Sequence, residues 1–515
     1  MAATKASTAP ASGIHELKAD LSTSAFYSPD MAPTTRADRK WGLKDIAALW
    51  VSMSACITTY TLASSLIAKG MNWWQAVLTI FLGNVIVLIP MVLNAHAGTK
   101  YGIPFPIYCR ASFGLLGANV PALLRALVAC GWFGIQTWIG GEAIYKILEK
   151  AFPSWQELSK LPGLDINPAQ FACFLFFWGV NLFIIYRGIE SIRFLLNVKA
   201  PLLILLGLAL LAWAYREAGG FGPILSQPAK FATAAAFWAF FMPALTGAVG
   251  YWATLSLNIP DFTRYAYSQR DQVLGQALGL PTTMALYSFI GVAVTSAALL
   301  IYPTESADRL WDPVYLISKF TNPLVLIVAL FALSLATLAT NIAANVVSPA
   351  NDFAHLAPRY VSFRTGGLIT GIIGILIQPW KLYADPSGYI YTWLIAYSAL
   401  LGAVGGVLIA DYFLLRRTRL DLPGLYRKEG PYWYWGGVNP LALIALGAGI
   451  APCVPGFLAV VGWASFPSGG IGDVLARMYD YAWFISFAVA FVLYAAVMAL
   501  RGRGTAGGES RRDKE

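Results

Sequence analysis

Apolar segments about as long as a bilayer is thick recur along most of this chain, and they limit its fold more than any other feature. A helix needs about 20 apolar residues to cross the hydrocarbon core of a membrane. Twelve segments approach or exceed this length: residues 46–68, 74–93, 122–148, 168–186, 200–215, 233–257, 282–301, 323–347, 368–379, 389–415, 442–461 and 481–500. Only 12% of the residues are charged, against about 25% in soluble domains. The sequence therefore predicts an all-α membrane protein with twelve transmembrane helices.

The basic residues indicate how the chain is oriented in the membrane. The formal net charge of +10 would suit a nucleic-acid-binding protein, but most of the 36 Lys and Arg residues lie in the two tails and in every second loop, with the run at 416–419 as the densest cluster. Loops rich in Lys and Arg stay in the cytoplasm. We therefore expect a multi-pass protein of the plasma (inner) membrane with both termini cytoplasmic, and no nucleic-acid partner.

The two tails are predicted to be cytoplasmic extensions of the helical part. Residues 1–40 are polar and rich in Ser, Thr and Ala, with no apolar core before residue 46. This composition argues against a cleaved signal peptide and predicts a disordered segment. Residues 501–515 are predicted to form the second tail.

Two segments contain residues that weaken a helix in the middle of the membrane. Residues 52–61 crowd small and hydroxyl side chains, and the sixth segment has Gly247 and Gly250 at mid-span with Pro260 near its end. Interrupted helices are tolerated where the freed backbone groups line an enclosed site. The first and sixth spans occupy matching positions in two five-helix halves, which is typical of inverted-repeat transporters. Gly and Pro are also common in ordinary membrane helices, so one such segment alone would not indicate a site.

Polar side chains of the third and eighth spans are suited to bind a flat polar solute. Trp132 and Gln136 are four residues apart, so an indole face lies beside a carboxamide that donates and accepts hydrogen bonds. Asn341 and Asn345 share a helix face in the same way. Amides that faced lipid would be costly, so both pairs are predicted to face the interior. They either bind a planar heterocycle or join neighbouring helices by hydrogen bonds.

Two other classes of membrane protein fit the sequence less well. An intramembrane enzyme needs a nucleophile–base pair, a metal cluster or haem-binding histidines, whereas the 3 histidines of this chain lie away from the span centres. A passive channel needs a polar stripe along a whole helix, whereas the polar residues here cluster at one depth. The pattern favours a carrier, and we expect no enzymatic activity, no catalytic residues and no bound cofactor.

Eight short motifs support this interpretation by their order and spacing. They are WWQA at 73–76, GxxYGIPFP at 98–106, RASFG at 110–114, WFGIQTW at 132–138, NIPDFTRY at 258–265, TNIAAN at 340–345, ADYFLLRR at 410–417 and YWYWGGVN at 432–439. Together they resemble the motifs of the nucleobase:cation symporter-1 family, the permeases for purines, cytosine, uracil, allantoin, hydantoins and thiamine. The resemblance extends from Trp41 to about Pro440.

The resemblance implies a LeuT-like fold of two inverted five-helix repeats followed by two further helices. The first repeat would comprise residues 41–216, the second residues 230–417, and the additional helices residues 418–500. It also implies a secondary active transporter that imports a planar heterocycle such as uracil, allantoin or another hydantoin by cation symport with alternating access. Cytosine, purines and thiamine are the alternative substrates within the family. We expect a monomer.

Similarity to the bacterial hydantoin transporter of this family assigns four side chains to the substrate. Trp132 and Trp252 would enclose the ring between two indoles. Gln136 and Asn345 would form hydrogen bonds with its edge. The ring stacking tolerates many flat solutes, whereas two buried amides select those with a matching edge.

Three further residues are predicted around the substrate on the same similarity. Leu394 falls at the position of an outer gating leucine. Tyr251 directly precedes Trp252. Cys56 replaces a glutamine of the hydantoin transporter, which leaves the identity of the transported ring open.

The coupling ion is less well defined by the sequence. The sodium ligands of the family are backbone carbonyls that fall on Ser52 and Ala55, a carbonyl that falls on Ala336, and a hydroxyl that falls on Thr340. Ala339 stands where a second hydroxyl belongs, and the loss of one oxygen ligand weakens the binding of a hard cation. A proton-coupled carrier usually has an intramembrane acid, and no predicted span has one at mid-depth. Coupling to Na⁺ and coupling to H⁺ both remain open.

Overall fold

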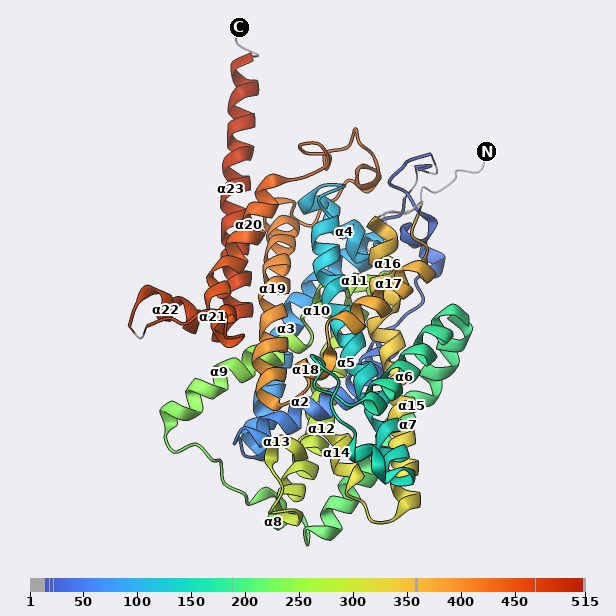
Figure 1. The fold of residues 1–515 in the computed structure, drawn as a ribbon. Coiled ribbons are helices and arrows are strands. Elements are labelled where there is room, and N and C mark those ends of the chain that lie inside the picture. Colours follow the sequence, from blue (N-terminus) through green and yellow to red (C-terminus); the bar gives the residue numbers. More distant parts are fainter. Residues whose placement is uncertain are drawn as a thin grey trace.

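A computed structural model describes residues 14–17, 19–21, 23–187, 189–356, 360–467 and 469–512. The described chain is helical, with isolated bridges between Trp41 and Ala266 and between Trp435 and Val438 in place of any strand. Figure 1 shows an upright bundle in which the segment before α1 and the far end of α23 lie at the same end of the molecule.

The long helices account for most of the bundle. They are α1 (Leu43–Ser54), α2 (Ile57–Ala68), α3 (Trp73–Tyr101), α5 (Asn119–Ala151), α6 (Pro168–Arg187), α7 (Ile189–Glu217), α9 (Ala234–Tyr251), α12 (Gln269–Ile301), α15 (Pro323–Asn345), α17 (Phe363–Leu376), α19 (Ile395–Ile409), α20 (Pro440–Ile450) and α23 (Ala482–Arg512). Two π-helical segments, Gly388–Leu394 and Ala410–Leu415, extend α19 at its two ends.

Short helices connect or continue these spans. They are α4 (Phe105–Phe113), α8 (Phe221–Leu225), α10 (Ala253–Asn258), α11 (Pro260–Thr263), α13 (Ala307–Leu310), α14 (Pro313–Ser318), α16 (Val347–Leu356), α18 (Pro379–Leu382), α21 (Val454–Val460) and α22 (Ile471–Met478). Single 3₁₀ turns lie at Pro29–Met31, Arg36–Asp38, Pro153–Glu157, Pro423–Tyr426, Ala451–Cys453 and Tyr479–Tyr481.

Each predicted membrane span coincides with one helix or with consecutive helices. Within the described residues, up to 10 spans are long and apolar enough to cross a bilayer when α1 and α2 count as one bent span. The remaining two predicted spans coincide with α7 and with the 14-residue α17. The ninth span ends earlier than predicted because Gln378 adopts a left-handed conformation, with φ 53°, and Pro379 begins a new helix. The all-α membrane architecture is confirmed.

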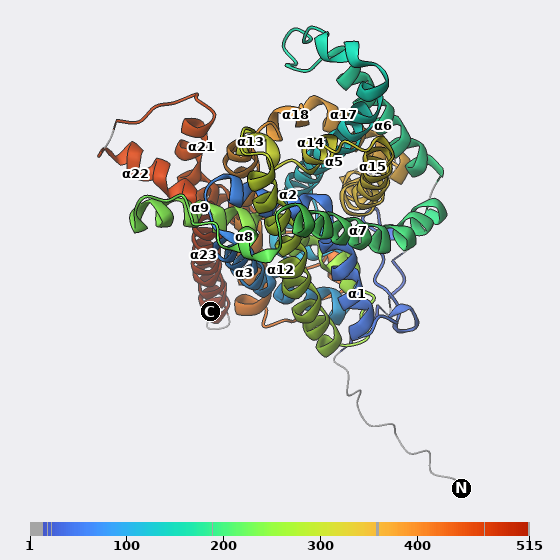
Figure 2. The same cartoon turned by 90° about the horizontal axis from the view of Figure 1, so that it is seen from below.

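Both predicted interruptions are present, although Gly247 and Gly250 themselves lie within α9 and the second break follows them. The first span leaves the helical conformation at Ala55 and Cys56, and its halves α1 and α2 meet at 57°. The sixth span is interrupted at Trp252, between α9 and α10. Figure 2, seen along the bundle, shows α1, α2 and α12 close together, and α5 close to α15. The breaks therefore face the middle of the bundle, where the polar residues of α5 and α15 lie.

Part of the amino-terminal segment differs from the prediction of disorder. Residues 1–13 lie outside the described residues, but Leu21 and Met31 are buried. The Tyr426 hydroxyl donates to the Met31 carbonyl at 2.9 Å, and Arg39 Nη1 donates to the Thr99 carbonyl at 2.6 Å. A polar segment with few apolar residues cannot form its own core, but here a preformed helical surface supplies the partners.

A buried ion pair joins α5 to α16 near the end of the bundle where α1 begins. Arg125 Nη1 lies 2.7 Å from Asp352 Oδ2, and the two side chains are 1% and 2% exposed. With the Asn258 amide oriented to satisfy its neighbours, its oxygen accepts from Arg125 Nη2 at 3.1 Å and from the Ser348 hydroxyl at 3.0 Å. The broken sixth span is thereby tied to the third and eighth spans.

Arg125→Gln should destabilise the protein, because it leaves the Asp352 carboxylate buried without its charged partner. Breaking a buried ion pair from one side costs about 3–5 kcal/mol. The loss appears as a lower midpoint of thermal unfolding in detergent. Lys69→Gln is the matched control: it removes the Lys69–Asp308 pair, whose side chains are 25% and 55% exposed, and exposed pairs contribute about 0–1 kcal/mol. Equal shifts in the two variants would contradict this role of the buried pair.

Candidate functional site

A small cavity lies where α1, α5, the broken sixth span and α15 meet. Its lining residues are Met53, Cys56, Thr58, Trp132, Gln136, Tyr251, Trp252, Thr254, Leu255, Thr340, Ala344 and Asn345. Six of the seven predicted substrate residues are therefore brought together. The cavity is narrow, with a volume of about 30 Å³.

Aromatic rings form one wall of the cavity. The Tyr251 ring meets Trp132 edge to face, with centroids 5.3 Å apart, and meets Trp252 in the same way at 5.0 Å. Trp50 packs behind Trp252 at 5.3 Å. The indole Nε1 of Trp252 is buried and has no hydrogen-bond partner in the described part of the chain. The wall thus combines ring faces with one free donor.

The two predicted amides differ in how they are held. Asn345 Nδ2 donates to Asn341 Oδ1 at 3.0 Å. Asn341 Nδ2 in turn lies within hydrogen-bond distance of the Asn181 side-chain oxygen, the Thr137 hydroxyl and the Phe133 carbonyl, at 3.0–3.2 Å. These acceptors fix the Asn341 amide, which then fixes the Asn345 amide. The Asn345 oxygen is left to accept a hydrogen bond from a ligand.

Gln136 supplies a second amide oxygen that can accept a hydrogen bond. Its side chain is buried, and its Oε1 atom has no hydrogen-bond partner among the residues that the structure describes. A buried polar atom without a partner is costly, so a ligand N–H is the natural partner for it. An amide that nothing else orients can also rotate to donate.

Cys56 belongs to a cluster of hydroxyl groups at the break in the first span. The Tyr251 hydroxyl lies 2.7 Å from the Thr58 hydroxyl and 3.3 Å from Cys56 Sγ. Thr59 is in reach of the same hydroxyl, at 3.2 Å. These contacts tie the start of α2 to the end of α9, so the two interrupted spans meet beside the cavity.

Leu394, the predicted outer gating residue, does not line the cavity. It is fully buried in the π-helical segment before α19. A Cβ atom at Gly250 would lie 2.8 Å from the Leu394 carbonyl oxygen, and one at Gly247 would lie 3.5 Å from Leu394 Cδ1. The glycines of α9 therefore allow the tenth span to pack directly on the sixth.

Of the four residues predicted to bind the cation, only Thr340 lines the same cavity. Ser52 lies in the last turn of α1, and Ala55 follows that helix at the break. On α15, Thr340 lines the cavity and its hydroxyl donates to the Ala336 carbonyl at 3.0 Å. Ala339 is buried beside them and brings no side-chain oxygen. Thr340 thus places an oxygen next to the polar–aromatic cavity.

Aromatic residues separate the cavity from the loop between α12 and α15. Tyr389 packs against Trp132 with centroids 6.3 Å apart, and Trp311 packs against Tyr389 at 5.7 Å and Tyr383 at 4.9 Å. Asp312 caps α14 beside them, and burial raises the pKa of its carboxyl group to about 6.

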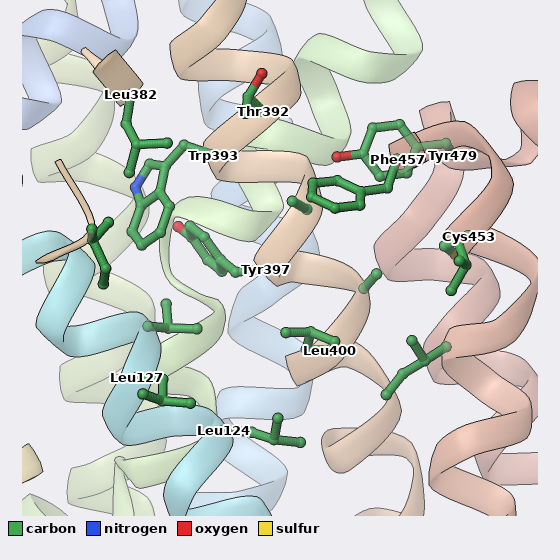
Figure 3. Close-up of a pocket in the computed structure, with 16 residues that line it drawn as sticks. Leu124, Leu127, Leu382, Thr392, Trp393, Tyr397, Leu400, Cys453, Phe457 and Tyr479 are labelled. Atoms are coloured by element: carbon green, nitrogen blue, oxygen red, sulfur yellow. The ribbon is translucent and has the colours of Figure 1, made fainter. Parts of the chain in front are cut away.

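A larger cavity, of about 410 Å³, lies between α5, α19 and the α20–α21 region. Figure 3 shows Trp393 and Tyr397 on one helix facing Leu127 on another, with Phe457 and Tyr479 on the far side. Almost all of its lining is apolar, and it contains none of the predicted amides. It cannot recognise the edge of a polar ring, so the smaller cavity is the candidate site.

Several residues around the small cavity were not identified from the sequence. Met53, Thr58, Thr254, Leu255 and Ala344 line it. Their periodicity gives no signal because they lie where the helices break, and helical spacing does not carry across a break. Asn341 was recognised by its i, i+4 spacing to Asn345, but its role as the group that orients Asn345 follows only from the contacts.

The fold and the cavity define a class of protein. Solved transporters share the whole architecture: one titled a nucleobase-cation-symport-1 family transporter in a closed conformation with bromovinylhydantoin bound has a TM-score of 0.72 and 24% identity, covering 93% of this chain and 97% of its own. A Na⁺-coupled sialic acid symporter has a TM-score of 0.59 at 12% identity, covering 90% and 91%. The chain therefore has a LeuT-like membrane fold.

Sequence comparisons give the family. A family model described as permease for cytosine/purines, uracil, thiamine, allantoin matches residues 33–486. A purine-uracil permease of Arabidopsis thaliana is 44% identical over 481 residues, covering 93% of this chain and 79% of that protein. An allantoin permease of Bacillus subtilis is 38% identical over 471 residues, covering 91% and 92%. The chain belongs to this permease family, as the motifs predicted.

Asn341→Ala should weaken substrate binding without a direct contact to the ligand. It releases the Asn345 amide, whose oxygen then no longer points into the cavity in a fixed orientation. A net hydrogen bond is worth about 0.5–1.5 kcal/mol, so KM for uptake should rise about two- to tenfold, with the maximal rate retained. Asn181→Ala is the control, because it leaves the Phe133 and Thr137 acceptors in place. An unchanged KM for Asn341→Ala would contradict the orienting role.

Proposed function

We propose that this protein imports a nucleobase or a related planar heterocycle, such as uracil, allantoin or another hydantoin, together with a cation. The relatives named as purine-uracil and allantoin permeases support this substrate class. The family consists of permeases, and the protein acts as a transporter rather than an enzyme. Cytosine, purines and thiamine are alternative rings within the same family.

The observation that carries the proposal is the pair of amide oxygens beside two indoles. Asn345 is oriented as an acceptor and the Gln136 oxygen lacks a partner. Uracil and hydantoins present N–H groups next to carbonyls on a flat ring, which suits two acceptors and a rotatable amide. Trp132 and Trp252 supply faces for stacking. A ring without N–H groups on its edge would leave the buried acceptors unpaired.

The small cavity fits alternating access. The cavity is narrow, with a volume of about 30 Å³, and the site opens toward one side of the membrane to load and toward the other to release. The 57° break between α1 and α2 and the break at Trp252 are the points where the halves of these spans can tilt. Such half-helices around a central site are typical of transporters of this architecture.

We further propose the domain limits and orientation predicted from the sequence. Residues 41–216 and 230–417 form the two five-helix repeats, and residues 418–500 add two helices. The basic loops place both termini in the cytoplasm and the protein in the plasma (inner) membrane. The protein acts as a monomer, because the cavity is formed within one chain.

Asn345→Ala should abolish saturable uptake of uracil and allantoin while the protein still reaches the membrane. The substitution removes the oriented acceptor and leaves the ring edge unpaired. Uptake of radiolabelled substrate and the amount of protein in the membrane are measured together. Asn84→Ala is a matched control, because Asn84 is a buried amide on α3 that donates to the Ile80 carbonyl at 2.7 Å, away from the cavity. Unchanged kinetics in Asn345→Ala would remove this residue from the substrate site.

The coupling cation is proposed to bind at the oxygens of Ser52, Ala55, Ala336 and Thr340. Ala339→Ser restores a hydroxyl where the family places one. If Na⁺ is the coupling ion, an added oxygen ligand strengthens its binding, and uptake should reach half-maximum at a lower sodium concentration.

A carrier driven by protons would instead show the same sodium-independent uptake in Ala339→Ser and in the parent protein. Ala329→Ser is the control, since Ala329 is a buried residue of α15 that does not line the cavity. An equal change in both variants would indicate a general effect on α15 and would contradict the proposed position of the cation.

A further inference from the structure

A second groove lies on the outer surface of the bundle, away from the substrate cavity. It has a volume of about 520 Å³ and lies between the last turns of α6 and the first turns of α17. Phe183 and Leu368, on its two sides, are 60% and 47% exposed. Gly179 lines it too, and a Cβ atom there would meet nothing within 4 Å. Part of the groove is therefore free of side chains.

Two arginines lie at the same end of this groove. Arg364 lines it and packs on Tyr186, with its guanidinium carbon 4.8 Å from the ring centroid. Arg187, the last residue of α6, packs on Phe183 at 5.7 Å. Neither arginine forms an ion pair with any side chain that the structure describes. Both arginines are exposed on this surface.

The two arginines and the apolar groove follow one another as the headgroup and the acyl chain of a lipid do. The arginines stand at the helix ends that face the cytoplasm in the proposed orientation, and the apolar groove extends from them toward the membrane interior. Basic pockets between spans on this side suit the headgroups of anionic lipids, and arginine matches the geometry of a phosphate. We propose that this groove binds one anionic phospholipid of the cytoplasmic leaflet, with its phosphate at Arg187 and Arg364 and an acyl chain along Gly179.

The wall behind the groove connects it to the substrate site. Trp178 Nε1 donates to the Gly371 carbonyl at 2.9 Å, which holds α6 on α17. Ile185 packs in one cluster with Phe133 and Val346, the residues next to Trp132 and Asn345 in the chain. A lipid that fills the groove therefore supports the helices that carry two of the proposed substrate contacts.

Lipid retention tests the proposal without reference to transport. The purified protein is reconstituted in nanodiscs with equal amounts of phosphatidylglycerol and phosphatidylcholine, and native mass spectrometry measures which lipid remains bound. The parent protein should retain phosphatidylglycerol preferentially. Each arginine near the surface contributes about 1 kcal/mol toward anionic lipid, so Arg187→Gln/Arg364→Gln should lower the preference roughly 30-fold.

Lys44→Gln/Arg270→Gln is the matched control for charge. Lys44 and Arg270 are exposed, lie at the same end of the molecule on α1 and α12, and do not line the groove. This pair should keep the preference for phosphatidylglycerol. A preference that persists in Arg187→Gln/Arg364→Gln, or that falls equally in both pairs, would overturn the proposal.

Gly179→Phe tests the apolar part of the groove separately. The open space at this position should accept the new ring without a loss of thermal stability, and the retained phosphatidylglycerol should fall although both arginines remain. Unchanged retention in a folded Gly179→Phe protein would contradict the placement of the acyl chain. If the parent protein instead forms a dimer without bound lipid, and Gly179→Phe dissociates that dimer, the groove binds a second copy of the chain. This result would overturn the lipid site.

Discussion

The hydrogen bonds of Asn341 determine what the candidate site can recognise. Three acceptors from α5 and α6 surround its amide nitrogen, so its oxygen has to face Asn345. Asn345 is left with an oxygen toward the cavity. Inside a membrane protein, where water does not compensate an unpaired group, such a fixed acceptor selects strongly for a ligand N–H. In the proposed site, selectivity thus depends on a residue that has no place among the proposed substrate contacts.

The helix breaks make room for this arrangement. A continuous first span would run its backbone past the cavity with every carbonyl paired, and a continuous sixth span would carry Trp252 away from Tyr251. At Cys56 and Trp252 the chain leaves the helix, and the Thr58–Tyr251 hydrogen bond of 2.7 Å joins the two breaks. The same breaks that expose polar groups to a ligand give the half-helices freedom to tilt, so recognition and movement share one location.

Periodicity and composition predict most of this architecture, because each membrane span has a strong hydropathy signal of its own. The i, i+4 pairs Trp132–Gln136 and Asn341–Asn345 were found in the same way. What depends on distant contacts was not predictable: the partner of Arg125 lies 227 residues away, and Asn181 contacts Asn341 across two helices. The packing of Leu21 and Met31 was missed for a similar reason, since a surface that only the folded bundle creates decides whether a polar tail is ordered.

A structure of the protein with uracil or a hydantoin bound tests the central claim most directly. We predict density for the ring between the indoles of Trp132 and Trp252, in a cavity wider than the present one, with a ring N–H within hydrogen-bond distance of the Asn345 oxygen and Asn341 still bonded to Asn345. Density for the ring in the apolar cavity beside Trp393, or an Asn345 amide turned away from the bound ring, would contradict this account.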